Sequence, residues 1–208
     1  MIIDIFQDTI CPWCRIGKKN LFDAINQWDG EPITLRYRSF QLNPETPEEG
    51  IPFWEYMGAM KGGAEGAKQM VQHAANAGEA AGIPFRFDKV SMWPNTLASH
   101  QLIKLASAEM QTEMVDALYR AYFEEGKDIG QLDTLVSIAG QHGMDEEETR
   151  RLIENGEKQD EIREDLNYAR QLQITGVPFF VVDGKLALSG AHPIENFLKA
   201  FRQVSETL

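Results

Sequence analysis

The chain has 208 residues, of which 43% are hydrophobic and 25% are charged, a balance typical of an ordinary globular protein. Its 32 acidic and 20 basic residues give a formal net charge of −12. So acidic a chain argues against nucleic acid and anionic lipid as partners, since both carry negative charge. Ten of the acids lie in residues 144–165 with only four bases, and this run is expected to form a solvated helix face.

No segment approaches the roughly 20 apolar residues that span a membrane. The first eight residues contain two acids and no base, unlike the start of a signal peptide. We therefore expect a cytoplasmic protein that has no membrane partner.

The first forty residues carry the pattern of a β–α–β unit. Residues 2–7 are mostly apolar and favour a buried strand. Apolar residues from Ile16 to Trp28 recur at three- and four-residue steps, as on one face of a helix, and Pro12 fits the first turn of that helix. Residues 33–40 alternate between apolar and polar, which indicates a second strand. Two strands joined by a helix are expected to run parallel.

The middle of the chain, residues 53–172, shows mostly helical periodicity and little strand signal. Asn95 or Thr96 is expected to cap one helix, and Asp133 and Asp145 are expected to cap two later helices. This stretch predicts an all-helical region.

The end of the chain returns to strand patterns. Residues 179–182 and 185–189 are two strand-like runs on either side of Asp183-Gly184, a dipeptide that favours a two-residue hairpin turn. Pro193 then opens a last amphipathic helix. The end therefore predicts a β–β–α unit.

Together these units predict an α/β protein with a thioredoxin fold and a large inserted all-helical domain. Residues 1–50 and 173–208 would form the thioredoxin-like domain, and residues 51–172 would form the insertion.

Cys11 and Cys14 are the only cysteines in the chain. Residues three apart share one face of a helix, close enough for a disulfide after modest adjustment. Cys11 would lie at the helix N-terminus, where the helix dipole favours a thiolate, so it is predicted to be the nucleophile and Cys14 the resolving thiol. A tetrahedral zinc site needs further ligands. The four histidines show no ligand spacing, so no metal is expected.

Pro178 has two interpretations. It could simply open the strand at 179–182, because the first position of a strand tolerates proline. In a thioredoxin fold it would instead be a cis-proline opposite the cysteines, and the backbone of Val177 could then pair with an extended substrate. The second interpretation is favoured by its place in the predicted fold.

Six segments of the chain resemble the DsbA family of thioredoxin-like proteins, and specifically its cytosolic FrnE-like branch. They are Asp8–Gly17, Phe40–Pro44, Asn95–His100, Ala121–Ile129, Gly176–Phe180 and Ser189–Ala191. The resemblance implies a thioredoxin domain with an inserted helical domain, a redox pair at Cys11 and Cys14, and a cis bond before Pro178. It also suggests a homodimer.

One residue departs from the best-known periplasmic members, which carry a histidine where this chain has Trp13. An indole cannot stabilise a thiolate by charge, but it offers an apolar surface beside Cys11 that suits hydrophobic substrates. The sequence thus predicts a protein-disulfide oxidoreductase with Cys11, Cys14 and Pro178 as catalytic residues. Pro12, Trp13 and Val177 would contact thiol or disulfide substrates, either proteins or glutathione, and no resident cofactor is expected.

Two other functions are kept as alternatives. Kappa-class glutathione transferases and 2-hydroxychromene-2-carboxylate isomerases resemble the same fold with the same insertion, but they use a serine at the position of Cys11. Because two cysteines stand there in this chain, a disulfide mechanism is favoured, and glutathione stays an alternative co-substrate. Arg15 and Lys18 are its candidate contacts, although their plainer interpretation is as exposed helix residues.

The other alternative is a chaperone-like binding module. Its groove would use apolar residues of the middle region, although such residues at helical spacing are more often core. They are Phe53, Trp54, Tyr56, Met57, Met60, Met92 and Trp93. His100 is interpreted as a helix histidine rather than a site residue.

Overall fold

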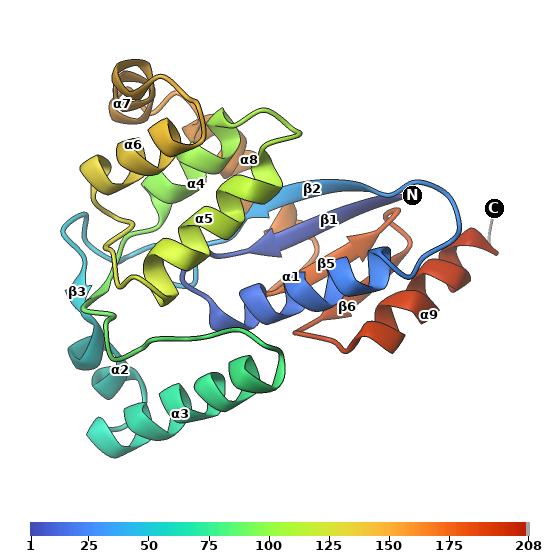
Figure 1. The fold of residues 1–208 in the computed structure, drawn as a ribbon, viewed down its shortest axis with the longest axis horizontal. Coiled ribbons are helices and arrows are strands. Elements are labelled where there is room, and N and C mark those ends of the chain that lie inside the picture. Colours follow the sequence, from blue (N-terminus) through green and yellow to red (C-terminus); the bar gives the residue numbers. More distant parts are fainter. Residues whose placement is uncertain (207–208) are drawn as a thin grey trace. The chain divides into compact units, whose positions relative to one another are not determined.

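The computed structural model describes residues 1–206 and divides into two compact units (Figure 1). One unit comprises Met1–Leu42 and Glu164–Leu208, and the other comprises Asn43–Arg163. The sequence predicted one unit of residues 1–50 with 173–208 and another of residues 51–172. Both junctions between the units thus lie earlier in the chain than predicted.

The first unit is built on a four-stranded sheet with the order β2-β1-β5-β6. As predicted, β1 (Ile2–Gln7) and β2 (Thr34–Ser39) are parallel, and α1 (Pro12–Ile25) connects them. The strands β5 (Phe179–Val182) and β6 (Leu186–Ser189) form the predicted hairpin, and β5 lies antiparallel to β1. This mixed α/β sheet, with a β–α–β unit and a β–β–α unit side by side, is the thioredoxin-type architecture that the sequence predicts.

Alternation along the strands divides the sheet into two faces. Ile3 and Ile5 of β1 and Phe180 of β5 are fully buried on the face covered by α1 and α9 (Ile194–Ser205), where the rings of Phe180 and Phe197 lie 4.9 Å apart (Figure 1). Phe6 points to the other face. It packs there in a cluster with Ala169, Ile174 and Val181, which brings in the end of α8 (Gln159–Gln171).

The tip of the β5–β6 hairpin places Asp183 and Gly184 in the turn, as predicted, with positive φ angles of 48° and 66°. The connection is one residue longer than predicted, because Val182 pairs with Leu186 and Lys185 therefore lies in the loop and not in β6. The N–H of Asp183 donates to the carbonyl of Ile2 at 2.8 Å, and the Asp183 carboxylate accepts from the N–H of Ile2. The hairpin tip is thereby tied to the start of β1.

A buried ion-pair network joins α8 to the sheet. The Arg38 guanidinium donates to Asp4 at 2.7 Å and to Asp165 at 3.0 Å, and the second oxygen of Asp165 accepts from the N–H of Ser39 at 2.8 Å. Asp165 is only 2% exposed. Its carboxylate therefore depends on these partners, since an unpaired buried charge is strongly destabilising.

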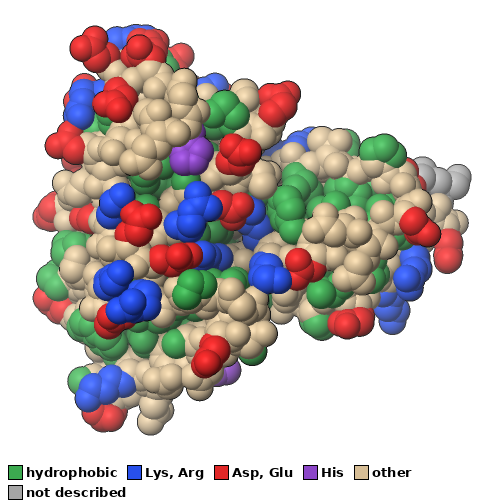
Figure 2. Space-filling view, viewed as in Figure 1, with side chains coloured by type: hydrophobic (Ala, Val, Ile, Leu, Met, Phe, Trp, Pro, Cys, Tyr) green, Lys and Arg blue, Asp and Glu red, His purple; other side chains and the backbone are tan. Residues whose placement is uncertain are grey.

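Asp165 corrects the expectation that the whole acidic run of residues 144–165 is solvated. The other nine acids of the run are exposed, and several pair with a base one turn away, as Glu148 does with Arg151 at 2.6 Å. Acidic and basic side chains are interspersed over the surface that Figure 2 shows. Asp165 differs because it is the last acid of the run and lies on the side of α8 that meets β2.

The second unit is mostly helical, as predicted. Its elements are α2 (Phe53–Met60), α3 (Ala64–Ala80), α4 (Leu97–Leu105), α5 (Gln111–Phe123), α6 (Leu132–Gln141), α7 (Glu146–Glu154), β3 (Ile51–Pro52) and β4 (Met92–Trp93). The antiparallel pair β3–β4 was not predicted, because two residues are too few to show a period. Phe123 lies at the centre of an aromatic core and contacts the rings of Phe85 and Tyr122, each at 4.9 Å.

Two of the three capping predictions are correct. Asp145 accepts a 2.8 Å hydrogen bond from the first turn of α7, and Asn95 accepts one of 2.9 Å at the start of α4. Asp133 was wrongly predicted as a cap. It lies inside α6, whose N-cap is Gln131, and its carboxylate pairs with Arg150 instead. Within residues 1–206, no helix combines the length and the apolar character needed to cross a membrane.

The Arg38 network generates a stability prediction. Arg38→Leu should lower the free energy of unfolding by about 3–5 kcal/mol, because Asp165 would stay buried without its cation. Arg150→Leu is the matched control. It removes an exposed ion pair and should cost at most about 1 kcal/mol. Urea unfolding of both variants measures the difference, and equal losses would contradict the role given to Arg38.

Candidate active site

The two cysteines follow directly from the end of β1. Cys11 is the N-cap residue of α1, with extended backbone angles (φ −91°, ψ 112°), and Pro12 is the first helical residue. The N–H of Cys11 donates to the carbonyl of Asp8 at 3.1 Å, which closes the turn between strand and helix. Pro12 fits this place because its fixed φ suits a helix and its missing N–H needs no partner there.

Cys14 lies one turn into α1. Its N–H donates to the carbonyl of Cys11 at 3.1 Å. Both residues are free thiols and both are buried, at 3% exposure for Cys11 and 2% for Cys14. The first thiol is thus at the positive end of the helix dipole, and the second is inside the fold.

The environment of Cys14 favours its neutral form. Burial raises the pKa of the Cys14 thiol above its ordinary value, and the hydrogen bond with Cys11 and the charge of that neighbour act in the same direction. The backbone at Asp8 lowers the pKa through a hydrogen bond, but this effect is smaller. Cys14 therefore keeps its proton at neutral pH, as suits a thiol that reacts second.

The structure brings the cis-proline segment to Cys11. The Val177–Pro178 peptide bond is cis, as predicted, and the Cys11 thiol donates to the carbonyl of Val177 at a donor–acceptor distance of 3.5 Å. The carbonyl of Pro178 accepts from the N–H of Gly190 at 2.8 Å, which ties this segment to the residue that follows β6. The sequence predicted that Cys11 and the Val177–Pro178 bond belong to one fold. The structure adds the direct contact between the Cys11 thiol and the Val177 carbonyl.

Gly17 is a residue that sequence reasoning missed as part of the site. A Cβ atom at this position would lie 3.0 Å from Pro178, 3.1 Å from the Phe180 ring and 3.4 Å from the backbone of Ala191. A side chain at this position would therefore force α1 or the cis-proline segment to shift by a few tenths of an ångström. Its position one turn after Cys14 was the available signal, but a single glycine in a helix is ambiguous.

The other candidate residues have mixed outcomes. Pro12 and Trp13 are half-buried in the first turn of α1. Lys18 corrects the interpretation as an exposed helix residue. It is 6% exposed, and its ammonium lies 4.3 Å from the centre of the Phe22 ring. Arg15 is half-buried.

The residues proposed for a chaperone groove belong to the second unit and do not form one exposed surface. Phe53, Met57 and Trp93 are buried, and Tyr56 stacks on Trp93 at 4.2 Å. Trp54 is exposed. His100 is fully buried in α4 of the same unit. Among residues 1–206, no group of three or more His, Cys, Asp or Glu residues is placed to hold a metal ion.

Comparison with known proteins agrees with this geometry. A family model described as "DSBA-like thioredoxin domain" matches residues 2–202. The chain belongs to the family of DSBA-like thioredoxin domains. Its relatives include the protein YwbO of Bacillus subtilis (strain 168), which is 26% identical over 204 residues, 95% of this chain and 94% of YwbO.

Solved structures extend the comparison. The probable DsbA oxidoreductase SCO1869 from Streptomyces coelicolor is 31% identical, with a TM-score of 0.90 over 98% of this chain and 89% of SCO1869. A 2-hydroxychromene-2-carboxylate isomerase (14% identity, TM-score 0.76) shares the fold over 100% of this chain and 97% of its own. The cytosolic disulfide reductase DsbM from Pseudomonas aeruginosa (16% identity, TM-score 0.71) also shares the fold, over 100% of both chains. These neighbours agree with the resemblance to the FrnE-like branch of the DsbA family.

The close approach at Gly17 can be tested by filling it. Gly17→Ala should lower the free energy of unfolding by about 1–3 kcal/mol, because the added methyl group overpacks the contact with Pro178 and Phe180. Gly58→Ala is the matched control in α2, where the nearest atom to a new Cβ is 3.9 Å away. The free energy of unfolding of this control should stay the same or rise by up to about 1 kcal/mol, because alanine favours a helix more than glycine does. If both variants unfold alike, the close packing is not a constraint.

The raised pKa of Cys14 makes the stability of the reduced protein depend on pH. The folded state holds this proton to higher pH than the unfolded chain, whose cysteines ionise near pH ~8.5. The stabilisation is therefore complete below that pH. Above it, the free energy of unfolding falls by up to about 1.4 kcal/mol per pH unit until the folded Cys14 also ionises.

Urea unfolding between pH ~7 and pH ~10 measures this effect. Cys11→Ser, which retains Cys14, should lose stability with rising pH more steeply than the double variant Cys11→Ser/Cys14→Ala. Parallel pH profiles for the two variants would contradict the environment described for Cys14.

Proposed function

We propose that this protein is a thiol–disulfide oxidoreductase in which Cys11 is the nucleophile and Cys14 the resolving thiol. The observation that supports it most is the position of the Cys11 thiol, at the start of α1 and 3.5 Å from the carbonyl of Val177 in the cis Val177–Pro178 segment. A thiol at a helix N-terminus is favoured as an anion, and the thiolate is the reactive form.

In the first step, the Cys11 thiolate attacks one sulfur of a substrate disulfide. A mixed disulfide forms between Cys11 and the substrate, the substrate's own S–S bond breaks, and the departing sulfur takes up a proton from water. The raised pKa of Cys14 keeps this second thiol protonated meanwhile, so it does not compete as a nucleophile.

In the second step, Cys14 loses its proton to water and attacks the sulfur of Cys11. The Cys11–Cys14 disulfide forms, the mixed disulfide breaks, and the second substrate sulfur leaves and is protonated. Two electrons have then passed from the protein dithiol to the substrate. The same steps in reverse oxidise a substrate dithiol.

The cis-proline segment supplies the expected contact for the substrate chain. The Val177 backbone is half-buried beside Cys11, where it could pair with an extended peptide by strand addition. Pro12 and Trp13 lie in the same turn as Cys11 and would contact apolar groups on either side of the substrate sulfur.

The reaction needs no resident cofactor, because the dithiol itself carries the two electrons. Protein thiols or glutathione would return or remove them. We place this reaction in the cytoplasm, in agreement with the sequence-based expectation for location. A homodimer also remains a prediction.

Variants of the two cysteines test the proposal. Cys11→Ser should abolish exchange with a model protein disulfide, because the remaining thiol, Cys14, is buried and protonated. Cys14→Ser should accumulate a mixed disulfide with that substrate, because the resolving thiol is lost. Non-reducing gels and mass spectrometry identify the trapped species.

The outcome also separates the glutathione-dependent alternative. A transferase or isomerase would act on its substrate with glutathione and would keep its activity in Cys14→Ser. Full dithiol activity in Cys11→Ser, or no trapped species in Cys14→Ser, would overturn the proposal. Binding of unfolded chains that survives replacement of both cysteines would favour the chaperone-like alternative.

A further inference from the structure

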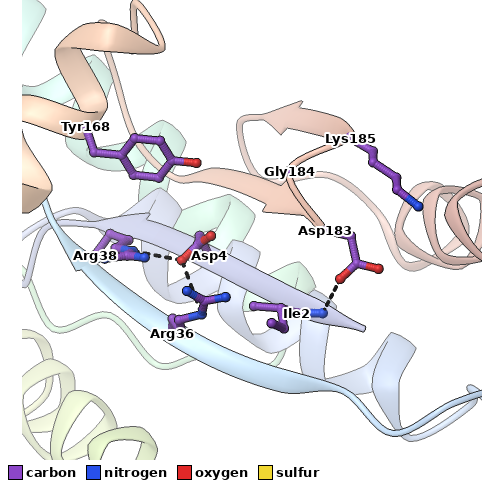
Figure 3. Close-up of a pocket in the computed structure, with 8 residues that line it drawn as sticks. All are labelled: Ile2, Asp4, Arg36, Arg38, Tyr168, Asp183, Gly184 and Lys185. Atoms are coloured by element: carbon purple, nitrogen blue, oxygen red, sulfur yellow. Dashed lines mark hydrogen bonds and ion pairs between the residues drawn. The ribbon is translucent and has the colours of Figure 1, made fainter.

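A pocket of about 430 Å³ opens on the sheet of the first unit (Figure 3). Its lining comes from the first half of β1, from Arg36 and Arg38 of β2, from Tyr168 of α8 and from the turn of the β5–β6 hairpin. Cys11 follows the opposite end of β1. The pocket is therefore separate from the cysteine pair, and a ligand bound there would not depend on the proposed redox function.

The pocket exists because α8 covers only part of this face of the sheet. Tyr168 of α8 packs on Phe6 at a ring distance of 5.6 Å, near the end of β1. Ile2 and Asp4 point to the same face but lie nearer the start of β1, beyond that contact. Ile2 is consequently 36% exposed and gives the pocket an apolar floor.

The acids of the pocket already have partners. Asp4 accepts from Arg38 at 2.7 Å and lies 3.8 Å from the guanidinium of Arg36. Asp183 accepts from the N–H of Ile2 at the other side of the pocket. Asp4 is therefore already paired with cations, and one oxygen of Asp183 is held by the backbone.

Three hydrogen-bond donors of the pocket, in contrast, have no close acceptor among the described residues: the side chains of Arg36, Lys185 and Tyr168. The Arg36 side chain is half-exposed, and its only interaction among residues 1–206 is the 3.8 Å ion pair with Asp4. The Lys185 ammonium is exposed and makes no hydrogen bond or ion pair within that part of the chain. The Tyr168 hydroxyl also has no hydrogen-bond partner there, while its ring lies 5.5 Å from the Arg38 guanidinium.

These groups frame one space. Figure 3 shows the Tyr168 hydroxyl pointing into the pocket, Arg36 on the strand below it, and Lys185 at the opposite rim beside Asp183. Two cationic groups and one hydroxyl thus line the pocket with donors to spare, while each of its two carboxylates already accepts a hydrogen bond through one oxygen. A complementary ligand must bring acceptor oxygens and negative charge.

We infer that this pocket binds a small organic anion, a phosphate or carboxylate carried on a ring or a short apolar body. The anionic group would accept from Arg36 and from the Tyr168 hydroxyl, and the apolar body would cover Ile2. Lys185 would add charge from the rim. The volume lies within the range of roughly 300–1,000 Å³ that is usual for small-molecule sites.

Titration of the full chain followed by amide NMR tests this inference. The probes are phenyl phosphate, benzoate and the neutral benzyl alcohol. The two anions, or one of them, should shift the amide signals of Ile2, Gly184 and Lys185 saturably, and benzyl alcohol should not. Whichever anion binds more tightly identifies the phosphate or the carboxylate as the preferred group.

Two variants assign the binding to the named groups. Arg36→Gln should weaken binding about tenfold, because it removes a charge-assisted contact, and Tyr168→Phe should weaken it about two- to tenfold. Arg150→Gln, which changes an exposed arginine of the second unit, is the control and should bind as the parent does. The Arg36 side chain is half-exposed, and Tyr168→Phe keeps the ring that packs on Phe6, so the fold should persist.

Three results would overturn the inference. They are the absence of saturable shifts with either anion, equal binding of benzyl alcohol, and equal weakening in Arg36→Gln and Arg150→Gln. The last result would mean that the anions bind to surface cations in general.

Discussion

The site depends on the close packing of α1 against the cis-proline segment. Gly17 has no side chain, so the helix that carries Cys11 and Cys14 can lie directly against Pro178 and Phe180. This contact sets the Cys11 thiol 3.5 Å from the carbonyl of Val177. The segments that meet there are far apart in the sequence, and the shared sheet of β1 and β5 brings them together.

The same geometry gives the two cysteines different environments. Cys11 is the N-cap residue of α1, whereas Cys14 lies one turn into the helix, where burial raises its pKa. The difference orders the two steps of the proposed exchange without any additional catalytic group. The buried Arg38–Asp165 pair supports the site indirectly, because it ties α8 to the sheet on which β1 and β5 lie.

Much of this could be predicted from the sequence. The apolar runs before Cys11 and before Asp183-Gly184, and the helical spacing between Ile16 and Trp28, are local patterns, so the sheet and its helices were predicted nearly in full. Contacts between distant segments leave no such local pattern. The burial of Asp165 inside an acidic run, the burial of Lys18 and the closeness of Gly17 to Pro178 therefore appeared only in the structure. The anion pocket was missed for the same reason, since Arg36, Tyr168 and Lys185 come from three separate elements.

The central claim is that Cys11 and Cys14 exchange reversibly between dithiol and disulfide within the folded protein. Equilibration in buffers of reduced and oxidised glutathione, followed by acid quenching, alkylation and mass spectrometry, measures it most directly. The account predicts a single two-electron transition in which one species loses both free thiols together as the buffer becomes more oxidising. A protein that keeps both thiols free at every ratio, or that only acquires glutathione on Cys11, would contradict it.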